Sequence, residues 1–494
     1  MKLKDMELEL DYELQQGTLE TEVTALVYDS RKVVPGCMFV CISGTTVDAH
    51  TFIPKAVKDG ARVIVAEHEV EAPQEITVLV TRDNRRALAY LAAAWFGHPA
   101  RKMTTIGITG TKGKTTTSYT IQAMLAAAGK KVGVIGTIGA VIDGKHVPTH
   151  NTTPESYEIQ SLFAEMADAG CEYVVMEVSS QGLKMHRVDG FLFDIGIFTN
   201  FSEDHIGPNE HASMEEYLYC KSLLFTMSRH SIVNRDDPVW DKVSAVRFGT
   251  RETYGFSEDA DLRLSDLKLF NENGKLGITF RTSGILNETV NVATPGKFSA
   301  YNAAAGLAAG CRLGLSFADM QKALLTVHVP GRVEIVPVSE HFSVIIDYAH
   351  NAVSVESLLT TIREYRPKRL VCVFGGGGNR SRLRRYDMGE LCGRMADLSI
   401  LTCDNPRDEE VAAINADIRK GFARSKAPDG GEPKILEIPD RKDAIWYAFD
   451  HAEEGDVILL LGKGHETYQE IKGVKYPYSE RGTVEAYKEA RGLA

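Results

Sequence analysis

The sequence predicts an α/β protein of three domains built around parallel sheets. Short apolar runs alternate with helical stretches along most of the chain, as expected for strands buried on both faces of a doubly wound sheet. Several runs end directly in glycine or in polar and acidic residues, and ligands of such sheets gather beyond the carboxyl ends of the strands. At about 150 residues per domain, 494 residues suffice for three.

Composition excludes several classes of protein. Apolar residues make up 44% of the chain and charged residues 25%, values typical of folded globular domains. The net charge of -11 gives no basic footprint for nucleic acid. No apolar stretch approaches the roughly 20 residues of a membrane span, and the charged segment Met1–Glu9 is unlike a secretory signal. We therefore expect a cytoplasmic protein whose eight scattered cysteines are buried, reduced thiols.

Residues 1–98 are predicted to form a small α/β domain. Its expected strands are Cys37–Ile42, Val63–Ala66 and Val78–Val80, and its clearest helix is Arg85–Phe96. A Gly-His-Pro segment at position 97 then breaks the pattern, because glycine and proline mark turns.

Residues 99–331 are predicted to form the central domain. Its parallel strands are expected at Thr105–Thr109, Val132–Gly136, Tyr173–Val178 and Ile195–Thr199. The region Leu262–Val292 instead shows short alternating segments around an Asn-Gly turn, which predicts a small β subdomain.

Residues 332–494 are predicted to form a third, Rossmann-like α/β domain after the turn at Val329–Arg332. Its expected strands are Val344–Asp347, Leu370–Phe374, Leu398–Cys403 and Asp456–Leu461. The loops after these strands are rich in Gly, Asp, Asn and Arg, so this sheet too is expected to bind a ligand at its carboxyl edge.

A phosphate-binding loop follows the strand Thr105–Thr109. The segment contains Gly110, Thr111, Lys112, Gly113, Lys114, Thr115 and Thr116 and leads into an amphipathic helix. The glycines let phosphates approach the backbone amides, and the helix N-terminus favours anions. The lysine can reach the outer phosphates, and the hydroxyl that follows it can bind magnesium. Ile108 stands where the general pattern has its first glycine, so the loop is a variant typical of a narrower group.

Three further side chains could join this site. Glu177 ends a strand at the edge where the phosphate loop opens and could bind magnesium. His205 follows another strand, and Lys221 lies in a helical run. Residue type and position alone leave both ambiguous, because loop histidines are usually solvated and helix lysines usually extend into solvent.

These segments together resemble the Mur ligases. The resemblance runs in order from about residue 28 to residue 481 and includes Asp29-Ser-Arg, Asn151-Thr-Thr-Pro, Tyr301-Asn302, Pro330-Gly-Arg332, Asp347-Tyr-Ala-His350, Asp404-Asn-Pro-Arg407 and Gly462-Lys-Gly-His-Glu466. It implies an ATP-dependent ligase of peptidoglycan precursor synthesis that adds the third residue of the peptide. ATP would phosphorylate the γ-carboxylate of UDP-N-acetylmuramoyl-L-alanyl-D-glutamate, and an amine would displace the phosphate.

The resemblance also implies roles for individual residues. Lys114, Lys221 and His205 would be catalytic, and Thr115, Glu177, His205 and a carbamylated Lys221 would bind two magnesium ions. ATP would contact the phosphate loop together with Asn302, Arg332 and Asp347. The nucleotide sugar would contact Ser30, Asn151, Thr152, Thr153, Ser179 and Arg187, although Met185 replaces a glutamine of relatives.

The amino-acid substrate would contact Arg380, Asp404, Asn405, Pro406, Arg407, Gly462 and Glu466. A guanidinium at Arg407 can bind the distal carboxylate of meso-diaminopimelate through two hydrogen bonds and would repel the distal ammonium of lysine. Glu466 would accept the ammonium at the same end.

Other interpretations stay open. Cys403 and the segment 379–384 depart from the family pattern, so L-lysine or another diamino acid is an alternative substrate. A ligase resembling folylpolyglutamate synthase and a non-catalytic nucleotide-binding scaffold are alternative functions. We expect a monomer.

Overall fold

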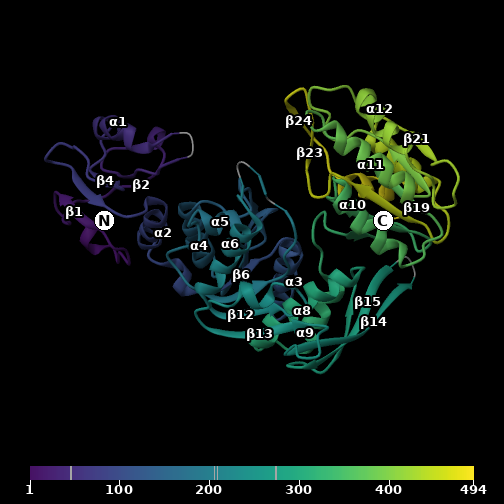
Figure 1. Ribbon diagram of the computed structural model, residues 1–494, viewed down its shortest axis with the longest axis horizontal. Coiled ribbons are helices and arrows are strands. Elements are labelled where there is room, and N and C mark those ends of the chain that lie inside the picture. The colour runs from purple at the N-terminus through teal and green to yellow at the C-terminus, as the bar shows by residue number, and fades with distance from the viewer. Residues whose placement is uncertain (45–46, 205, 208–209, 273–274, 494) are drawn as a thin grey trace. The chain divides into compact units, whose positions relative to one another are not determined.

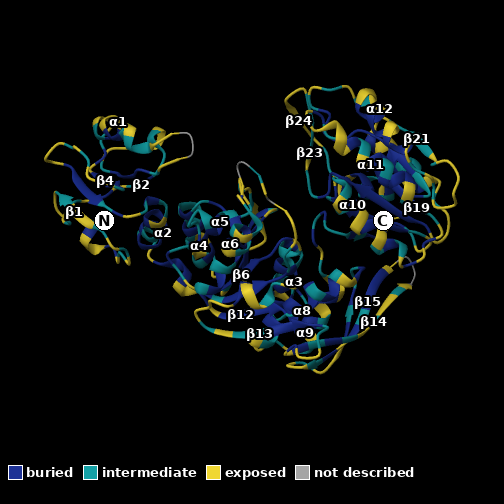
Figure 2. Cartoon of the chain, viewed as in Figure 1, coloured by how far each residue is buried: buried dark blue, intermediate teal, exposed yellow. Residues whose placement is uncertain are grey.

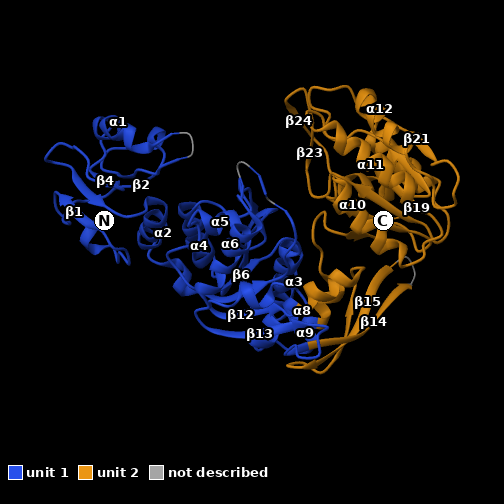
Figure 3. Ribbon diagram, in the orientation of Figure 1, with its two compact units in different colours: residues 1–262, 305–320 blue, residues 263–304, 321–494 orange. Residues whose placement is uncertain are grey.

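Two compact units make up the chain (Figure 3). The computed structural model describes residues 1–44, 47–204, 206–207, 210–272 and 275–493. The first unit contains Met1–Leu262 and Ala305–Met320, and the second contains Arg263–Ala304 and Gln321–Ala494. The predicted α/β class is confirmed, whereas the domain boundaries at residues 98 and 331 stay predictions.

The first unit begins with a five-stranded sheet. Its strand order is β1-β5-β4-β3-β2, and only β1 runs antiparallel to its neighbour. The elements are β1 (Glu13–Gln16), β2 (Leu26–Val27), β3 (Met38–Val40), α1 (Ile53–Lys58), β4 (Val63–Ala66), β5 (Thr77–Val80) and α2 (Asn84–Trp95). Asp83 caps α2 by accepting hydrogen bonds from the amides of Arg85 and Arg86, which satisfies donors that the first helical turn leaves open.

A larger parallel sheet follows in the same unit, with the order β13-β12-β11-β6-β10-β7-β8-β9. Strands β13 to β7 are parallel, and β8 and β9 add antiparallel. The strands are β6 (Thr104–Thr109), β7 (Val132–Gly136), β8 (Gly139–Ile142), β9 (Lys145–Val147), β10 (Tyr173–Glu177), β11 (Phe193–Phe198), β12 (Ser228–Asn234) and β13 (Thr250–Gly255). Its helices are α3 (Lys114–Ala127), α4 (Ser156–Asp168), α5 (Ser180–Lys184), α6 (Met214–Thr226) and α7 (Trp240–Val243).

The centre of this sheet is buried on both faces, as its apolar sequence predicts (Figure 2). Ile106 and Ile108 on β6 are fully buried. Strand β6, which is labelled in Figure 1, lies between β10 and β11 in the strand order of the sheet. The loops that follow these three strands therefore emerge side by side at one edge of the sheet.

The second unit opens with the small β subdomain expected at Leu262–Val292. It consists of β14 (Leu262–Glu272), β15 (Lys275–Gly284) and β16 (Thr289–Val292), and β15 and β16 pair antiparallel. Helices α8 (Lys297–Arg312) and α9 (Phe317–Thr326) follow and are divided between the two units.

A six-stranded sheet forms the rest of this unit, with the order β17-β18-β22-β19-β20-β21. Only β17 is antiparallel to its neighbour. The strands are β17 (Glu334–Val336), β18 (Ser343–Asp347), β19 (Leu370–Phe374), β20 (Leu398–Leu401), β21 (Ile435–Glu437) and β22 (Val457–Leu461), and a hairpin contains β23 (Tyr468–Ile471) and β24 (Val474–Pro477). The helices are α10 (Ala352–Arg363), α11 (Arg382–Met395), α12 (Val411–Phe422), α13 (Arg441–Asp450) and α14 (Glu480–Arg491).

A buried ion pair between α13 and the C-terminal helix α14 contacts the chain just after β20 and at the end of β22. The guanidinium of Arg441 pairs with Glu480 and donates to the backbone oxygens of Cys403, at 3.2 Å, and Leu461, at 2.8 Å. Both side chains are at most 1% exposed. Cys403 and Leu461 directly precede the loops that contain Asp404–Arg407 and Gly462–Glu466, so this pair fixes where the two loops start.

All eight cysteines are free thiols; seven are buried, and Cys311 is half-buried, although burial of all eight was expected. In the part of the chain that the structure describes, no helix combines the length and the apolar character needed to cross a bilayer.

We predict that Glu480→Ala lowers the free energy of unfolding by roughly 3–5 kcal/mol, because it leaves a buried guanidinium without its counter-charge. Urea unfolding followed by circular dichroism measures the change. Glu432→Ala is the matched control, since the Glu432 side chain is 78% exposed in its pair with Lys426 and exposed pairs contribute about 0–1 kcal/mol. Equal stability of the two variants would contradict the prediction.

Candidate active site

The phosphate loop joins the central strand β6 to α3. Gly110 and Gly113 have φ values of 147° and 84°, in the region that favours glycine. A Cβ on Gly110 would lie 1.9 Å from Oγ1 of Thr199, so no larger residue fits there. The loop therefore brings the backbone up to the N-terminus of α3, where the helix dipole favours anions.

The two predicted catalytic lysines meet at this loop. Nζ of Lys114 donates to the backbone oxygens of Gly110, at 2.8 Å, and Thr111, at 3.1 Å. Nζ of Lys221, on α6, donates to the same Gly110 oxygen at 2.8 Å. Lys221 is 1% exposed, and burial together with the positive charge of Lys114 lowers the pKa of Lys221 well below its ordinary value.

Glu177 lies beside the same loop, at the end of β10. Its carboxylate accepts from Oγ1 of Thr115 at 3.0 Å, and from the amide and hydroxyl of Thr137 at 3.0 and 3.1 Å. A Cβ on Gly136 would lie 2.2 Å from this carboxylate, so the neighbouring strand must end in glycine. Thr137 was missed by the sequence analysis, although its position directly after β7 was the available signal.

These donors partly match the predicted metal site. The Thr115 hydroxyl and the Glu177 carboxylate are hard oxygen donors of the kind that magnesium prefers, whereas a protonated Lys221 would repel a cation. His205 lies outside the described residues. Among the residues that are described, no three His, Cys, Asp or Glu side chains gather as a metal site. A divalent ion therefore fits at Thr115 and Glu177, and Lys221 can join only if its amine becomes an oxygen donor.

A cavity of about 220 Å³ opens next to the lysines. It is lined by Lys114, Ser179, Ser180, Gln181, Glu210, His211, Tyr217 and Lys221. The ring of Tyr217 lies 4.3 Å from Nζ of Lys221, and Nε2 of the buried His211 lies 2.8 Å from Oγ of Ser180. Ser179 was predicted, but the spacing of His211 and Tyr217 gave no signal for a role here.

Four residues predicted to bind the nucleotide sugar cluster beyond β10. Thr153 donates through its hydroxyl to the backbone oxygen of Glu177 at 3.0 Å and accepts from the Ser179 amide at 2.9 Å. Arg187 donates to the backbone oxygen of Thr153 at 3.0 Å. The Thr152 hydroxyl lies 3.0 Å from the Thr137 hydroxyl.

The two other predicted nucleotide-sugar residues lie outside this hydrogen-bonded group. Asn151 is exposed just before the cluster. Ser30 begins a short helical turn after β2, in the five-stranded sheet.

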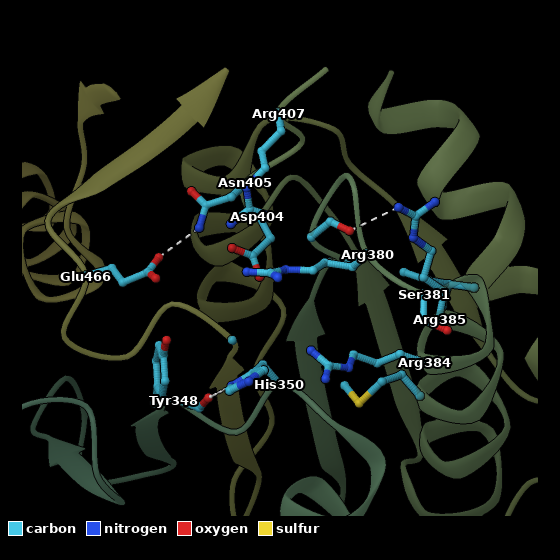
Figure 4. Close-up of a pocket in the computed structure, with 16 residues that line it drawn as sticks. Tyr348, His350, Arg380, Ser381, Arg384, Arg385, Asp404, Asn405, Arg407 and Glu466 are labelled. Carbon is cyan, nitrogen blue, oxygen red and sulfur yellow. Dashed lines mark hydrogen bonds between the residues drawn. The ribbon is translucent and has the colours of Figure 1, made fainter. Parts of the chain in front are cut away.

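A second cavity, of about 110 Å³, lies at the carboxyl edge of the six-stranded sheet (Figure 4). Of the residues predicted to bind the amino acid, all but Pro406 line it: Arg380, Asp404, Asn405, Arg407, Gly462 and Glu466. The backbone oxygen of Pro406 instead packs against Gly378, where a Cβ would lie 1.7 Å from it. The structure thus brings together residues from three separate loops.

Arg407 is held in a fixed orientation within this cavity. Its φ of 51° is unusual for a non-glycine residue, and its backbone bonds with Glu470 and Lys472 on the β23–β24 hairpin. Its guanidinium donates to Glu470 at 3.1 Å and to the Gly378 oxygen at 2.8 Å. Glu470 was missed by the sequence analysis, because nothing in the spacing pairs it with Arg407.

The charges around this cavity are mixed. Arg380 and Arg384 line it and make no ion pair with any residue that the structure describes, and Figure 4 shows Arg380 extending toward Asp404. Arg385, by contrast, is buried and paired with Glu409 and Asp417. Burial raises the pKa of Asp404, while Arg441 and Lys463 act in the opposite direction. The site therefore offers both cationic and anionic groups to a zwitterionic ligand.

The remaining residues predicted to bind ATP lie in the second unit, whereas the phosphate loop lies in the first. Asp347 ends β18 and accepts from the amides of Val333 and Ala349, each at 2.7 Å, and burial raises its pKa. Arg332 lies 5.2 Å from the ring of Tyr348, and Asn302 is buried on α8.

Comparison with known proteins identifies the family. Three family models match: "Mur ligase family, catalytic domain" at residues 22–96, "Mur ligase middle domain" at 108–310 and "Mur ligase, glutamate ligase domain" at 331–464. A UDP-N-acetylmuramoyl-L-alanyl-D-glutamate--2,6-diaminopimelate ligase of Clostridium perfringens is 38% identical over 98% of this chain and 99% of the relative. The ligase of that name from Geobacillus thermodenitrificans is 39% identical over 94% of each chain.

Solved structures agree with these matches. A structure of UDP-N-acetylmuramoyl-L-alanyl-D-glutamate--2,6-diaminopimelate ligase superposes with a TM-score of 0.74 at 26% identity and covers 100% of this chain and 99% of its own. MurF ligase of Thermotoga maritima, in complex with ADP, shares the fold with a TM-score of 0.57 at 19% identity, over 96% and 99% of the two chains. The phosphate loop, the buried lysine beside it and these full-length matches together establish that the chain belongs to the Mur ligase family.

Proposed function

We propose that this ligase uses ATP to join meso-diaminopimelate to UDP-N-acetylmuramoyl-L-alanyl-D-glutamate in the cytoplasm, as a monomer, for peptidoglycan synthesis. The observation that carries the proposal is the fixed Arg407 guanidinium, which shares a cavity with Glu466. Relatives 38–39% identical carry the name of diaminopimelate ligases, which supports the same substrates here. We also propose the three-domain division at residues 98 and 331.

The first step transfers the γ-phosphoryl group of ATP to the γ-carboxylate of the D-glutamate. The carboxylate oxygen attacks phosphorus and ADP leaves, which produces an acyl phosphate. Lys114 and the N-terminus of α3 would stabilise the phosphates, and Asn302, Arg332 and Asp347 would hold the rest of the nucleotide. Magnesium bound at Thr115 and Glu177 would neutralise charge on the transferring group.

The second step forms the amide. The unprotonated amine of the amino acid attacks the acyl carbon, the carbon–oxygen bond to phosphate breaks, and the amine proton passes to solvent or a base. Arg380 and Arg407 would bind carboxylates, and Glu466 would accept the distal ammonium. L-lysine lacks the distal carboxylate, so Arg407 would face its ammonium without a counter-charge.

We propose further that Lys221 is carbamylated. Its amine is buried beside Lys114, and both features favour the neutral form, which can attack carbon dioxide. A nitrogen–carbon bond forms, one carbon–oxygen π bond opens and a proton leaves. The resulting anion would be attracted to Lys114 and would supply oxygen donors for a second magnesium ion, with His205 as a further ligand.

The amine preference is tested by phosphate release with meso-diaminopimelate, L-lysine and L-ornithine. We predict turnover with meso-diaminopimelate, and a loss of about 100-fold in kcat/KM for it in Arg407→Ala. The variant removes the guanidinium that would pair with the distal carboxylate, and truncating one partner of such a pair, once bound substrate covers it, costs about 2–5 kcal/mol. Arg394→Ala is the control, since Arg394 pairs with Glu356 on the surface. A wild-type preference for L-lysine would refute the assignment.

The role of Lys221 is tested separately. We expect Lys221→Ala to lower kcat by roughly 100-fold or more, as removal of a preorganised electrostatic group does, and short carboxylates such as formate to restore part of it. Intact-mass analysis of the wild-type protein with and without bicarbonate would detect the carbamate. Lys184, which pairs with Glu216 at 2.8 Å, provides the control variant Lys184→Ala. Full activity of Lys221→Ala would exclude the role.

A further inference from the structure

Lys463 is a buried lysine next to the second cavity that the proposed mechanism does not use. It follows β22 by two positions and its side chain is 0% exposed. Its Nζ donates to Oδ1 of Asn405 at 2.9 Å, to Oε2 of Glu466 at 2.7 Å and to the backbone oxygen of Tyr468. An ammonium has three donors, so these three acceptors satisfy a protonated Lys463 completely.

Two of these acceptors face the cavity. Asn405 and Glu466 both line it, and Nδ2 of Asn405 also donates to Oε2 of Glu466 at 2.9 Å. Oδ1 of Asn405 accepts in addition from the Glu470 amide at 2.9 Å, and Glu470 is the residue that orients Arg407. Lys463 therefore lies at the centre of the hydrogen bonds that hold the side chains of Asn405 and Glu466 at the cavity.

Lys463 also balances charge at this wall. Its Nζ lies 3.8 Å from Oδ1 of Asp404, and Asp404 and Glu466 raise the local negative charge together. Without the ammonium, two carboxylates on one cavity would repel each other, and Oε2 of Glu466 would keep only the bond from Asn405. A carboxylate free to rotate away is a poorer acceptor for a substrate ammonium.

We propose that Lys463 is a positioning residue that holds Glu466 for the distal ammonium of the amino-acid substrate and so determines the preference for a diamino diacid over the same diacid without that amine. This inference rests on the proposed function. It assigns to Lys463 a role in substrate discrimination, apart from any contact with the substrate itself.

The test measures kcat/KM of Lys463→Met for meso-diaminopimelate and for 2-aminopimelate, which lacks the distal amine. We expect the KM for meso-diaminopimelate to rise about tenfold or more and the ratio between the two substrates to fall by a similar factor, since an oriented charge-assisted bond contributes at least this much. The KM values for ATP and for the nucleotide sugar should stay within about twofold. A merely structural defect would not change the substrate ratio selectively.

Lys475→Met is the matched control, because Lys475 lies 4.2 Å from the ring of Tyr468, as Lys463 lies 5.3 Å from it, yet is exposed. It should leave the ratio unchanged. If Lys463→Met does not fold, Lys463→Arg decides the matter. It keeps the charge but lacks the compact ammonium, and we expect it to reduce the ratio about threefold.

An unchanged substrate ratio in the folded variant would overturn the inference while leaving the proposed function intact. Absence of turnover by the wild-type protein with every diamino acid would instead overturn the proposed function.

Discussion

The position of both sites follows from one constraint, the side-by-side ending of parallel strands. In the central sheet, Glu177 on β10 pairs in register with Ile108 on β6, so the carboxylate arrives beside the phosphate loop as that loop begins. The pairing of β7 with β10 runs to Ile135 and Met176, so Gly136 and Thr137 follow beside Glu177, and Thr137 bonds to the same carboxylate. In the second unit, Asp347 pairs in register with Leu461, so the ATP-associated and amino-acid-associated loops begin at the same edge.

Buried cations hold the loops that follow these strands. Lys463 and Arg441 are each almost fully buried; Lys463 donates to the backbone oxygen of Tyr468, and Arg441 donates to those of Cys403 and Leu461. Burial of a charge is costly unless its donors are satisfied, so each cation tolerates few arrangements of its partners. This explains how loops of irregular conformation, including the positive φ of Arg407, can present side chains in fixed positions. Glycine contributes where the loops pass close to another chain segment, as Gly110, Gly136 and Gly378 do.

The sequence predicted strands and loops better than it predicted which side chains contact one another. Apolar runs such as Val132–Gly136 and Leu370–Phe374 were located to the residue, because a buried strand requires apolar side chains on both faces. All but Pro406 of the residues predicted to bind the amino acid, through the resemblance to a family, line the cavity at Arg407, whereas other lining residues such as Met388 and Ile418 were not predicted. Thr137, Glu470 and the pair Arg441–Glu480 were not predicted either, since each gains its role from contacts between segments that are distant in sequence. The spacing of residues along the sequence does not indicate such contacts, which only the fold shows.

If an acyl phosphate forms before the amine attacks, an oxygen atom passes from the γ-carboxylate to the released phosphate. Both γ-carboxylate oxygens of UDP-N-acetylmuramoyl-L-alanyl-D-glutamate are labelled with ¹⁸O, and the phosphate released during turnover with meso-diaminopimelate is analysed by mass spectrometry. One labelled oxygen is expected in each phosphate, because the carboxylate oxygen that attacked phosphorus leaves with it. Release of unlabelled phosphate alongside amide formation would exclude an acyl-phosphate intermediate.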